Sequence, residues 1–172
     1  MKTDCFDMQY QNRLIGARRI AYLYELANDK KDFVAMPSVE QLKYLWFHTQ
    51  YAFQQSNLYA ANSIPTKLRS IVIEGNSLTE KQIDTLSEVE HNRWNVERLL
   101  VGFRAYTYKE RIAVKNIMES SDEDAIKECK QNIDIRKKNQ FFHKDIAPYV
   151  ELHDSSKEYD RAIVRNILEV IK

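Results

Sequence analysis

The chain has 172 residues, a formal net charge of +1 at pH 7 and apolar side chains at 44% of its positions. This length is sufficient for one domain with a well-buried core. Acidic and basic residues are interspersed and form no basic stripe, which argues against a nucleic-acid polymer as the main partner. With only three glycines and three prolines, the composition favours long regular elements over loops.

The N-terminal sequence MKTDCFDMQY lacks the apolar core of a signal peptide, and no apolar run approaches the length that spans a membrane. Cys5 and Cys129 have no CxxC partner and no histidine at ligand spacing, which is typical of free thiols in a reducing compartment. We therefore expect a soluble, cytoplasmic protein with no membrane partner.

Hydrophobic periodicity predicts a first helix over residues 6–28, followed by a polar linker that contains Pro37. We expect Arg18 and Arg19 to lie on the solvated face of this helix.

Ser38 and Gln41 have the spacing of a capping box, which predicts a second helix from there to about residue 62. Its many aromatic side chains are interpreted as core residues. Pro65 suits the first turn of a short third helix that ends near residue 73, and residues 74–76 are expected to form a turn.

A long central helix is predicted from Thr79 to Phe103. Thr79 and Gln82 have the spacing of a second capping box, and Gly102 suits a left-handed residue after the helix end. On a helical wheel six apolar side chains gather on one side, which we take as the core face: Leu86, Val89, Val96, Leu99, Leu100 and Phe103.

Trp94 lies off this apolar stripe, on the side of the helix that carries Glu90, Glu97 and Arg98. One interpretation is a second core anchor covered by another element. The other is a stacking platform in a polar cleft that binds a ligand. Arg93 lies at the margin of the stripe, and if it is buried we expect Glu90 or Glu97 to pair with it.

After the central helix, residues 106–108 and 112–114 suggest a small β-hairpin. A charged helix is expected from Ser121 to about residue 139, as a solvated insertion. A loop over 141–152 precedes a last helix that Asp154 caps and that runs to the C-terminus. The predicted fold class is mainly α: a compact multi-helix domain with a short β-hairpin after the central helix.

The sequence offers little support for catalysis. It has no glycine-rich phosphate loop and no HExxH motif. Glu88 and His91 stand at E-x-x-H spacing, but a di-iron bundle needs two such motifs and two further glutamates. No nucleophile has a supporting local signature. We therefore expect no metal, no cofactor and no enzymatic activity.

What remains is a cleft in which Trp94 supplies a π-face and three arginines supply contacts to an anion. These are Arg98 on the central helix and the i, i+4 pair Arg161 and Arg165 on the last helix.

Four segments of the chain together resemble the RyR domain, the repeat named after ryanodine receptors and also found in bacterial proteins. They are QSNLYAANSIPTKLRSI (residues 55–71), EVEHNRWNVERLLVGF (88–103), HKDIAPYVEL (143–152) and SSKEYDRAIVRNILEVI (155–171). The family pattern has a helix with E-H-x-x-W, a Gly-Trp, a loop with H-P-x-L-V-P and a helix with K-x-x-D-R. The resemblance spans about Glu40 to Lys172 and leaves residues 1–39 outside as an N-terminal helix and linker.

The sequence departs from the family pattern in three places. Gly102-Phe103 replaces Gly-Trp, and Lys144 replaces the proline after the loop histidine. The Tyr-Gly-Pro-x-Arg-Asp turn is replaced by a charged insertion over about 115–140, so that Arg104 and Arg111 are the candidates to supply its ligand contacts.

In ryanodine receptors these repeats occur as tandem pairs, and a pair resembles an adenine-nucleotide site in which the tryptophan of the E-H-x-x-W helix stacks on the base. By resemblance that tryptophan is Trp94, and a homodimer of this single-copy chain would recreate the pair. The resemblance thus implies a regulatory module that recognises a nucleotide-type ligand. Its expected ligand-binding residues are Trp94, Glu90, His91, Arg98, Arg161 and Arg165.

The alternative is a protein-interaction or structural module. In that case Trp94, His91, His143 and the Asp160–Arg161 pair would form a buried polar network that joins the central helix, the loop and the last helix.

Overall fold

The structure is a computed structural model that describes the backbone of residues 2–73, 75 and 77–172, and the side chains of these residues from Tyr10 onward. Within this part of the chain there are eight α-helices and one two-stranded parallel sheet, which confirms the mainly α fold class. The chain forms two compact units, Met1–Trp94 with His153–Lys172, and Asn95–Leu152. None of the described helices is both long and apolar enough to cross a lipid bilayer.

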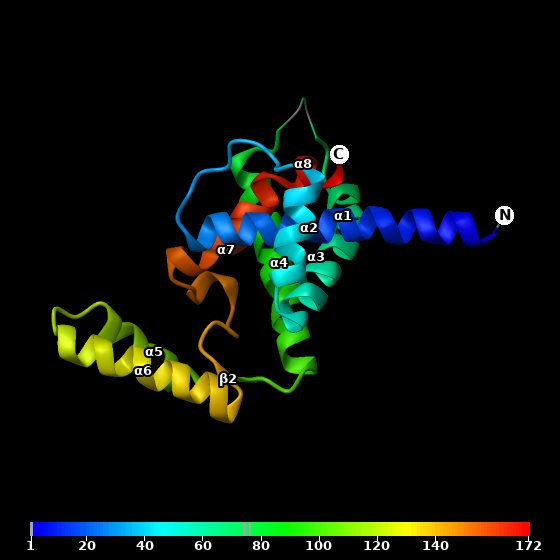
Figure 1. Cartoon of the computed structure of the whole chain (residues 1–172). Coiled ribbons are helices and arrows are strands. Elements are labelled where there is room, and N and C mark those ends of the chain that lie inside the picture. The colour runs from blue at the N-terminus through cyan, green and yellow to red at the C-terminus, as the bar shows by residue number, and fades with distance from the viewer. Residues whose placement is uncertain (1, 74, 76) are drawn as a thin grey trace. The chain divides into compact units, whose positions relative to one another are not determined.

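The first unit is a helical bundle built around α1 (Figure 1). Its helices are α1 (Lys2–Asn28), α2 (Val39–His48), α3 (Tyr51–Arg69), most of α4 (Glu80–Leu100), α7 (Asp154–Arg165) and α8 (Ile167–Ile171). Helix α1 packs against α2, α3, α7 and α8, and its residues Ala17, Ile20 and Leu23 lie in the main core. The N-terminal helix is therefore part of the core of this unit, and the expected boundary at residue 39 does not coincide with the division into units.

Helix α2 begins as predicted but ends early. Ser38 Oγ accepts from the Gln41 amide at 3.3 Å and Gln41 Oε1 accepts from the Ser38 amide at 3.0 Å, which confirms the capping box. The prediction of one helix to residue 62 was wrong, because Thr49 is extended and the chain restarts as α3 at Tyr51. Gln54 Nε2 donates to the backbone carbonyls of Trp46 (2.7 Å) and Thr49 (3.1 Å), so these two carbonyls at the break between α2 and α3 have hydrogen-bond partners.

The prediction of a separate short helix that starts at Pro65 was also wrong. Pro65 lies inside α3, where it removes one backbone donor. Helix α3 buries Ala60, Ala61 and Ile64 in the unit's core, and this burial outweighs the local cost.

The aromatic residues of α2 and α3 were predicted to be core residues, and most of them are not. Only Trp46 of this set packs against the main core. More than half of the surface of five others is exposed: Tyr44, Phe47, Tyr51, Phe53 and Tyr59. The core side of these helices is supplied instead by Leu42 and by small residues of α3 that allow α1 to approach closely.

Arg19 is not solvated as predicted. It is half-buried, and its guanidinium donates to the backbone carbonyls of Glu169 (3.2 Å) and Val170 (3.1 Å). These carbonyls end the last helix and have no partner within it, so Arg19 caps α8 from α1.

The capping signals at both ends of α4 are confirmed, although the helix ends at Leu100 and not at Phe103. Thr79 and Gln82 exchange the two capping-box hydrogen bonds (2.9 and 3.3 Å), and Gly102 is left-handed with φ +94°. The Phe103 amide donates to the Arg98 carbonyl and the Gly102 amide to the Leu99 carbonyl, which is a Schellman motif.

The predicted core face of α4 was wrong in four of its six positions. Leu86 is buried, but Val89, Val96, Leu99 and Leu100 are 45%, 56%, 51% and 82% exposed. The helix buries a mainly polar face instead: Ile83, Leu86, Ser87, Glu90, His91, Glu97 and Arg98.

The second unit contains a helical hairpin and a minimal sheet. Its elements are β1 (Arg104–Ala105), α5 (Tyr108–Met118), α6 (Glu123–Gln140), β2 (Phe142–His143) and a 3₁₀ helix (Tyr149–Glu151). The predicted β-hairpin over residues 106–114 was wrong, since Thr107 and Glu110 form a capping box (2.7 and 3.3 Å) that starts α5, and β1 pairs in parallel with β2. Helix α6 confirms the charged helix, with Asp122 as its N-cap.

The last predicted helix is divided in two. Helix α7 is capped by His153, whose side chain accepts from the Ser155 amide at 3.2 Å, and it ends at Asn166, where α8 begins. Ile163, Ile167 and Val170 face the core as predicted, whereas Ile171 is 53% exposed.

Candidate functional site: a buried polar cluster around Glu90

The site in the first unit is built on the polar face of α4. We call it the Glu90 cluster: Lys67 from α3, Glu90, His91 and Arg93 from α4, and Asp160 from α7. Because α4 turns this face inward, ionisable groups from three helices meet in the interior of one unit.

Glu90 is fully buried and forms ion pairs with two cationic side chains. One carboxylate oxygen accepts from Lys67 Nζ at 2.5 Å, and the other accepts from Arg93 Nε at 2.9 Å and Arg93 Nη2 at 2.8 Å. Lys67 is only 4% exposed and also donates to Ser63 Oγ at 2.5 Å. Burial acts to raise the pKa of Glu90, but Arg93 and Lys67 outweigh it and hold that pKa below its usual value. Arg93 is only partly buried, and it pairs with Glu90, one of the two acids that the sequence offered on this helix.

His91 and Asp160 form the second pair of the cluster. His91 Nδ1 lies 3.1 Å from Asp160 Oδ2, and both side chains are buried. Burial raises the pKa of Asp160, and the hydrogen bond and charge of His91 oppose this rise. The pair joins α4 to α7 across 69 residues of sequence.

Trp94 is half-buried and lies next to this pair. Its ring stacks on the His91 ring, with centroids 5.7 Å apart and an interplanar angle of 26°. The order along this face is therefore Asp160, His91 and then Trp94, so the carboxylate fixes the imidazole on which the indole packs.

Each of the three predicted anion contacts has a different acidic partner. Arg161 donates through Nε (3.1 Å) and Nη2 (2.8 Å) to Asp84 Oδ1, and Arg165 pairs with Glu158. Arg98 belongs to the second unit, where it donates to Glu97 at 2.5 Å. Of the six predicted residues, Glu90, His91 and Trp94 are brought together.

Lys67 was not predicted as a site residue, although the sequence carries a signal for it. Lys67 continues the buried face of α3, three residues after Ile64 and seven after Ala60. A lysine on an apolar face requires a buried acid as its partner. The sequence could therefore have indicated that Lys67 requires a buried acidic partner, but not that this partner is Glu90.

His143 belongs to a separate polar group in the second unit. Its Nδ1 accepts from the Asp145 amide at 3.2 Å, and its ring meets the Phe103 ring edge to face at 6.1 Å. Burial lowers the pKa of His143 to about 4, against an opposing effect of Asp145. Of the alternative network, the His91–Asp160 link and the Trp94 contact are present within the first unit.

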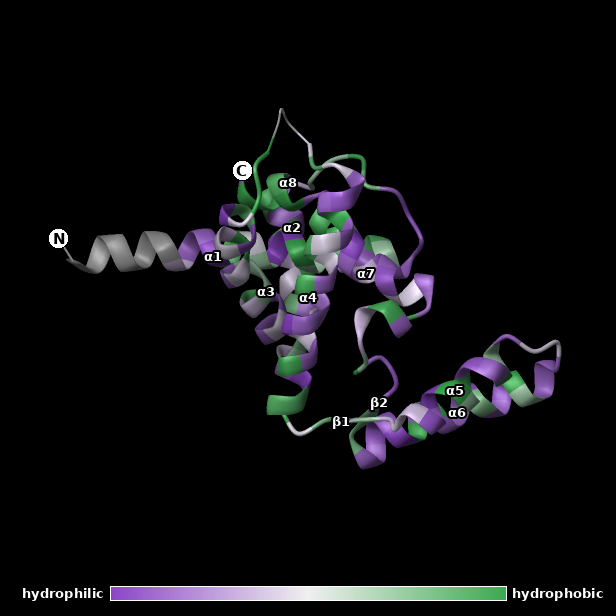
Figure 2. Ribbon diagram, turned by 180° about the vertical axis from the view of Figure 1, so that it is seen from behind, coloured by the Kyte–Doolittle hydropathy of each residue, from purple (hydrophilic) through white to green (hydrophobic). Residues whose placement is uncertain are grey.

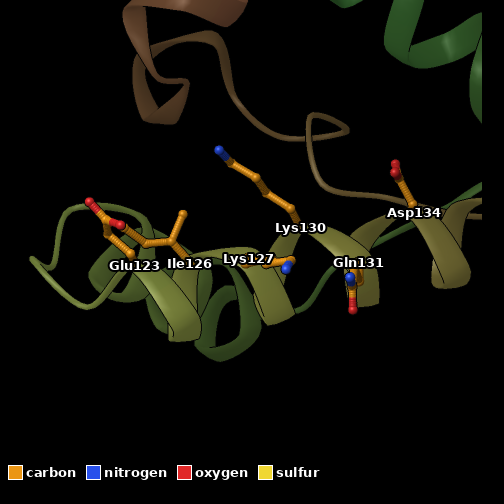
Figure 3. A pocket seen from close by; sticks show the side chains of 6 residues that line it. All are labelled: Glu123, Ile126, Lys127, Lys130, Gln131 and Asp134. Atoms are coloured by element: carbon orange, nitrogen blue, oxygen red, sulfur yellow. The ribbon is translucent and has the colours of Figure 1, made fainter.

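Two surface depressions occur on α5 and α6, and neither involves a predicted site residue. Figure 3 shows the first, of about 370 Å³, which is lined by side chains of α6 alone and mixes both signs of charge. The second, of about 330 Å³, lies between α5 and α6. In the described residues no group of three or more His, Cys, Asp or Glu side chains is arranged to hold a metal ion.

Comparison of the chain with protein-family models, with curated proteins and with solved structures finds no match.

Proposed function

We propose that this chain is a cytoplasmic, non-enzymatic ligand-binding module of the RyR-domain type, which recognises a nucleotide or nucleotide-derived signal at Trp94. The observation that supports it is the convergence of three distant sequence motifs. Lys67 comes from the first resembling segment, residues 55–71. Glu90 and His91 come from the E-H-x-x-W motif and Asp160 from the K-x-x-D-R motif, and all four side chains lie in one buried cluster.

In this proposal the Glu90 cluster positions Trp94. Both oxygens of Glu90 are already occupied, and Asp160 fixes the His91 ring under the indole. A rigid platform lowers the ordering cost of binding a flat base. Glu90 and His91 thus act on the ligand through Trp94.

Arg161 is the candidate for the phosphate contact. Its side chain is 25% exposed and its partner Asp84 is 56% exposed. A surface ion pair of this kind contributes about 0–1 kcal/mol. A phosphate can therefore replace Asp84 at low cost, with the bidentate geometry that arginine favours.

A thermal-shift titration with ATP, ADP, AMP and cyclic AMP tests the proposal. At a hundredfold excess over Kd, a ligand should stabilise the protein by about 2.7 kcal/mol, which is roughly 5–10 °C for a chain of this size. Trp94→Phe should retain part of the shift, and Trp94→Ala should abolish it while circular dichroism shows a folded protein. Trp46→Phe, the matched control at the other tryptophan, should shift as wild type does.

The alternative is a structural or protein-interaction module, and the burial of the Glu90 cluster favours it. Under this alternative no nucleotide shifts the melting temperature, and Trp94→Ala costs about 3–5 kcal/mol as a core truncation. If none of the four nucleotides raises the melting temperature of the well-folded protein, the nucleotide proposal is rejected and the structural or protein-interaction module remains.

A further inference from the structure

The second unit carries an exposed surface on which apolar and basic side chains lie together, apart from the Trp94 site. It forms where α4 and α6 end. Figure 2 shows that α4, green at its C-terminal end, leads into β1, and that α6 ends beside the same pair of strands. We call it the basic–apolar surface, and its residues are Leu100, Val101, Arg104, Lys137, Lys138 and Phe141.

Direct contacts hold the two segments of this surface together. The Phe103 and Phe141 rings meet edge to face with centroids 5.5 Å apart, and the Arg104 amide donates to the Phe141 carbonyl at 2.7 Å. Phe103 also meets the ring of His143, on which the charge of Lys137 acts. The fold therefore assembles a surface that no single stretch of the sequence contains.

The apolar part of the surface is exposed to solvent. Leu100 is 82% exposed, Val101 56% and Phe141 52%. Leu100 and Val101 are consecutive residues at the end of α4, and Phe141 directly follows α6. Neighbouring large apolar side chains that remain exposed mark a contact site for a protein or a membrane.

The basic part of the surface keeps an uncompensated positive charge. Arg104, Lys137 and Lys138 are exposed, and none of the three has an acidic partner in the described part of the chain. Asp145, close to these cations, is already in an ion pair with a lysine. The nearest exposed acid along α6, Asp134, lies one turn before Lys138 and forms no ion pair with it in the described structure.

We propose that the basic–apolar surface docks the protein on an anionic lipid bilayer. Leu100, Val101 and Phe141 enter the headgroup region, and the three cations contact the acidic headgroups. The sequence predicted no membrane partner because no apolar run is long enough to span a bilayer, and docking on its surface needs no such run.

The chemistry of the surface favours a bilayer over other partners. A second copy of the chain would bring like charges together. A polynucleotide would leave Leu100 and Val101 in water, because aliphatic side chains offer the bases no aromatic face on which to stack. Protein interfaces are depleted of lysine. An anionic bilayer satisfies both the cations and the aliphatic side chains.

Co-sedimentation of the full chain with lipid vesicles tests the proposal. Vesicles of phosphatidylcholine with about 30% phosphatidylserine should bind the protein at about 0.1 M salt, and vesicles of phosphatidylcholine alone should bind it at least tenfold more weakly. Each basic side chain near an anionic surface contributes a gain of roughly fivefold. Lys137→Glu with Lys138→Glu should therefore weaken binding by about 25-fold or more, whereas Lys137→Arg with Lys138→Arg should preserve it.

The apolar part is tested separately. Leu100→Ser with Val101→Ser should weaken binding by about tenfold, since two exposed apolar side chains no longer enter the headgroup region. This variant keeps every charge of the surface, so it separates insertion from electrostatic attraction.

Matched controls separate docking from folding and from the Trp94 site. Lys127→Glu with Lys130→Glu makes the same change of charge on exposed positions of α6 away from the surface and should bind as wild type does. Lysines in the last turn of α6 also favour the helix dipole, so circular dichroism must show that each variant keeps its helicity. Trp94→Ala should dock normally, so the docking proposal and the nucleotide proposal can fail independently.

Three results would overturn the proposal. One is equal binding to the two kinds of vesicle, or no binding to either. Another is wild-type binding by the charge-reversed variant or by the serine variant. The third is binding of a single-stranded oligonucleotide, and not of vesicles, that the charge-reversed variant loses, which would make the surface a nucleic-acid site.

Discussion

Replacing Glu90 by glutamine tests whether the Glu90 cluster holds the first unit together. The substitution keeps the shape of the side chain and removes its charge. Lys67, 4% exposed, then keeps its charge in the interior without its anionic partner. Arg93 loses the same carboxylate, but its side chain is 15% exposed and reaches water more easily.

The expected cost is about 3–5 kcal/mol, which is typical of breaking a buried ion pair by removing one partner. In a chain of this length that corresponds to roughly 10 °C in Tm. A second substitution, Lys67→Met, should recover part of the loss in the Glu90→Gln background, because the orphaned charge is then removed as well.

Urea and thermal unfolding of wild type, both single variants and the double variant give the coupling energy. Ser87→Ala is the matched control on the same buried face. Ser87 is fully buried and its hydroxyl has no hydrogen-bond partner in the described part of the structure, so its removal should be neutral or stabilising.

The pH dependence adds an independent check. The pKa of Glu90 is lowered in the folded state, so its stabilising contribution is present above its ordinary value of 4.5 and is lost as the pH falls through the folded-state pKa. Glu90→Gln should therefore weaken the acid destabilisation of the protein. A loss below 1 kcal/mol for Glu90→Gln, or equal effects of Lys67→Met in both backgrounds, would refute the reasoning.

Two further predictions concern single residues. The pKa of His143 is lowered to about 4, so NMR titration of its ring should show no protonation near pH 6.5. The free energy of unfolding should decline as the pH falls from 6.5 towards 4, because the unfolded chain then binds a proton that the folded protein does not. A ring that titrates near pH 6.5 would contradict its burial. Gly102→Ala should destabilise by about 1–2 kcal/mol through backbone strain alone, because φ is +94° and the added Cβ meets no atom within 4 Å. Gly16→Ala, in contrast, should stabilise the protein by about 0.5–1 kcal/mol, because alanine favours a helix over glycine. A Cβ added at Gly16 in α1 meets its nearest atom at 3.5 Å, which is an ordinary van der Waals contact. Chemical denaturation of both variants should show a lower free energy of unfolding for Gly102→Ala and a higher one for Gly16→Ala.

The sequence by itself determined the local starts and stops of helices. The capping boxes at Ser38 and Thr79, and the left-handed Gly102, involve residues within a few positions of one another, so local pattern is sufficient to predict them. The capping box at Thr107 is equally local, and its T-x-x-E spacing was sufficient to predict the start of α5. The prediction of a β-hairpin did not take this spacing into account.

Only the tertiary structure decided which face of α4 is buried. Periodicity assumes that apolar side chains point inward, and on α4 this assumption fails because Glu90 and His91 find partners on other helices. Those partners are 23 and 69 residues away in the sequence. A buried charge is tolerated only with its counter-charge in place, and no local pattern reports which distant residue supplies it.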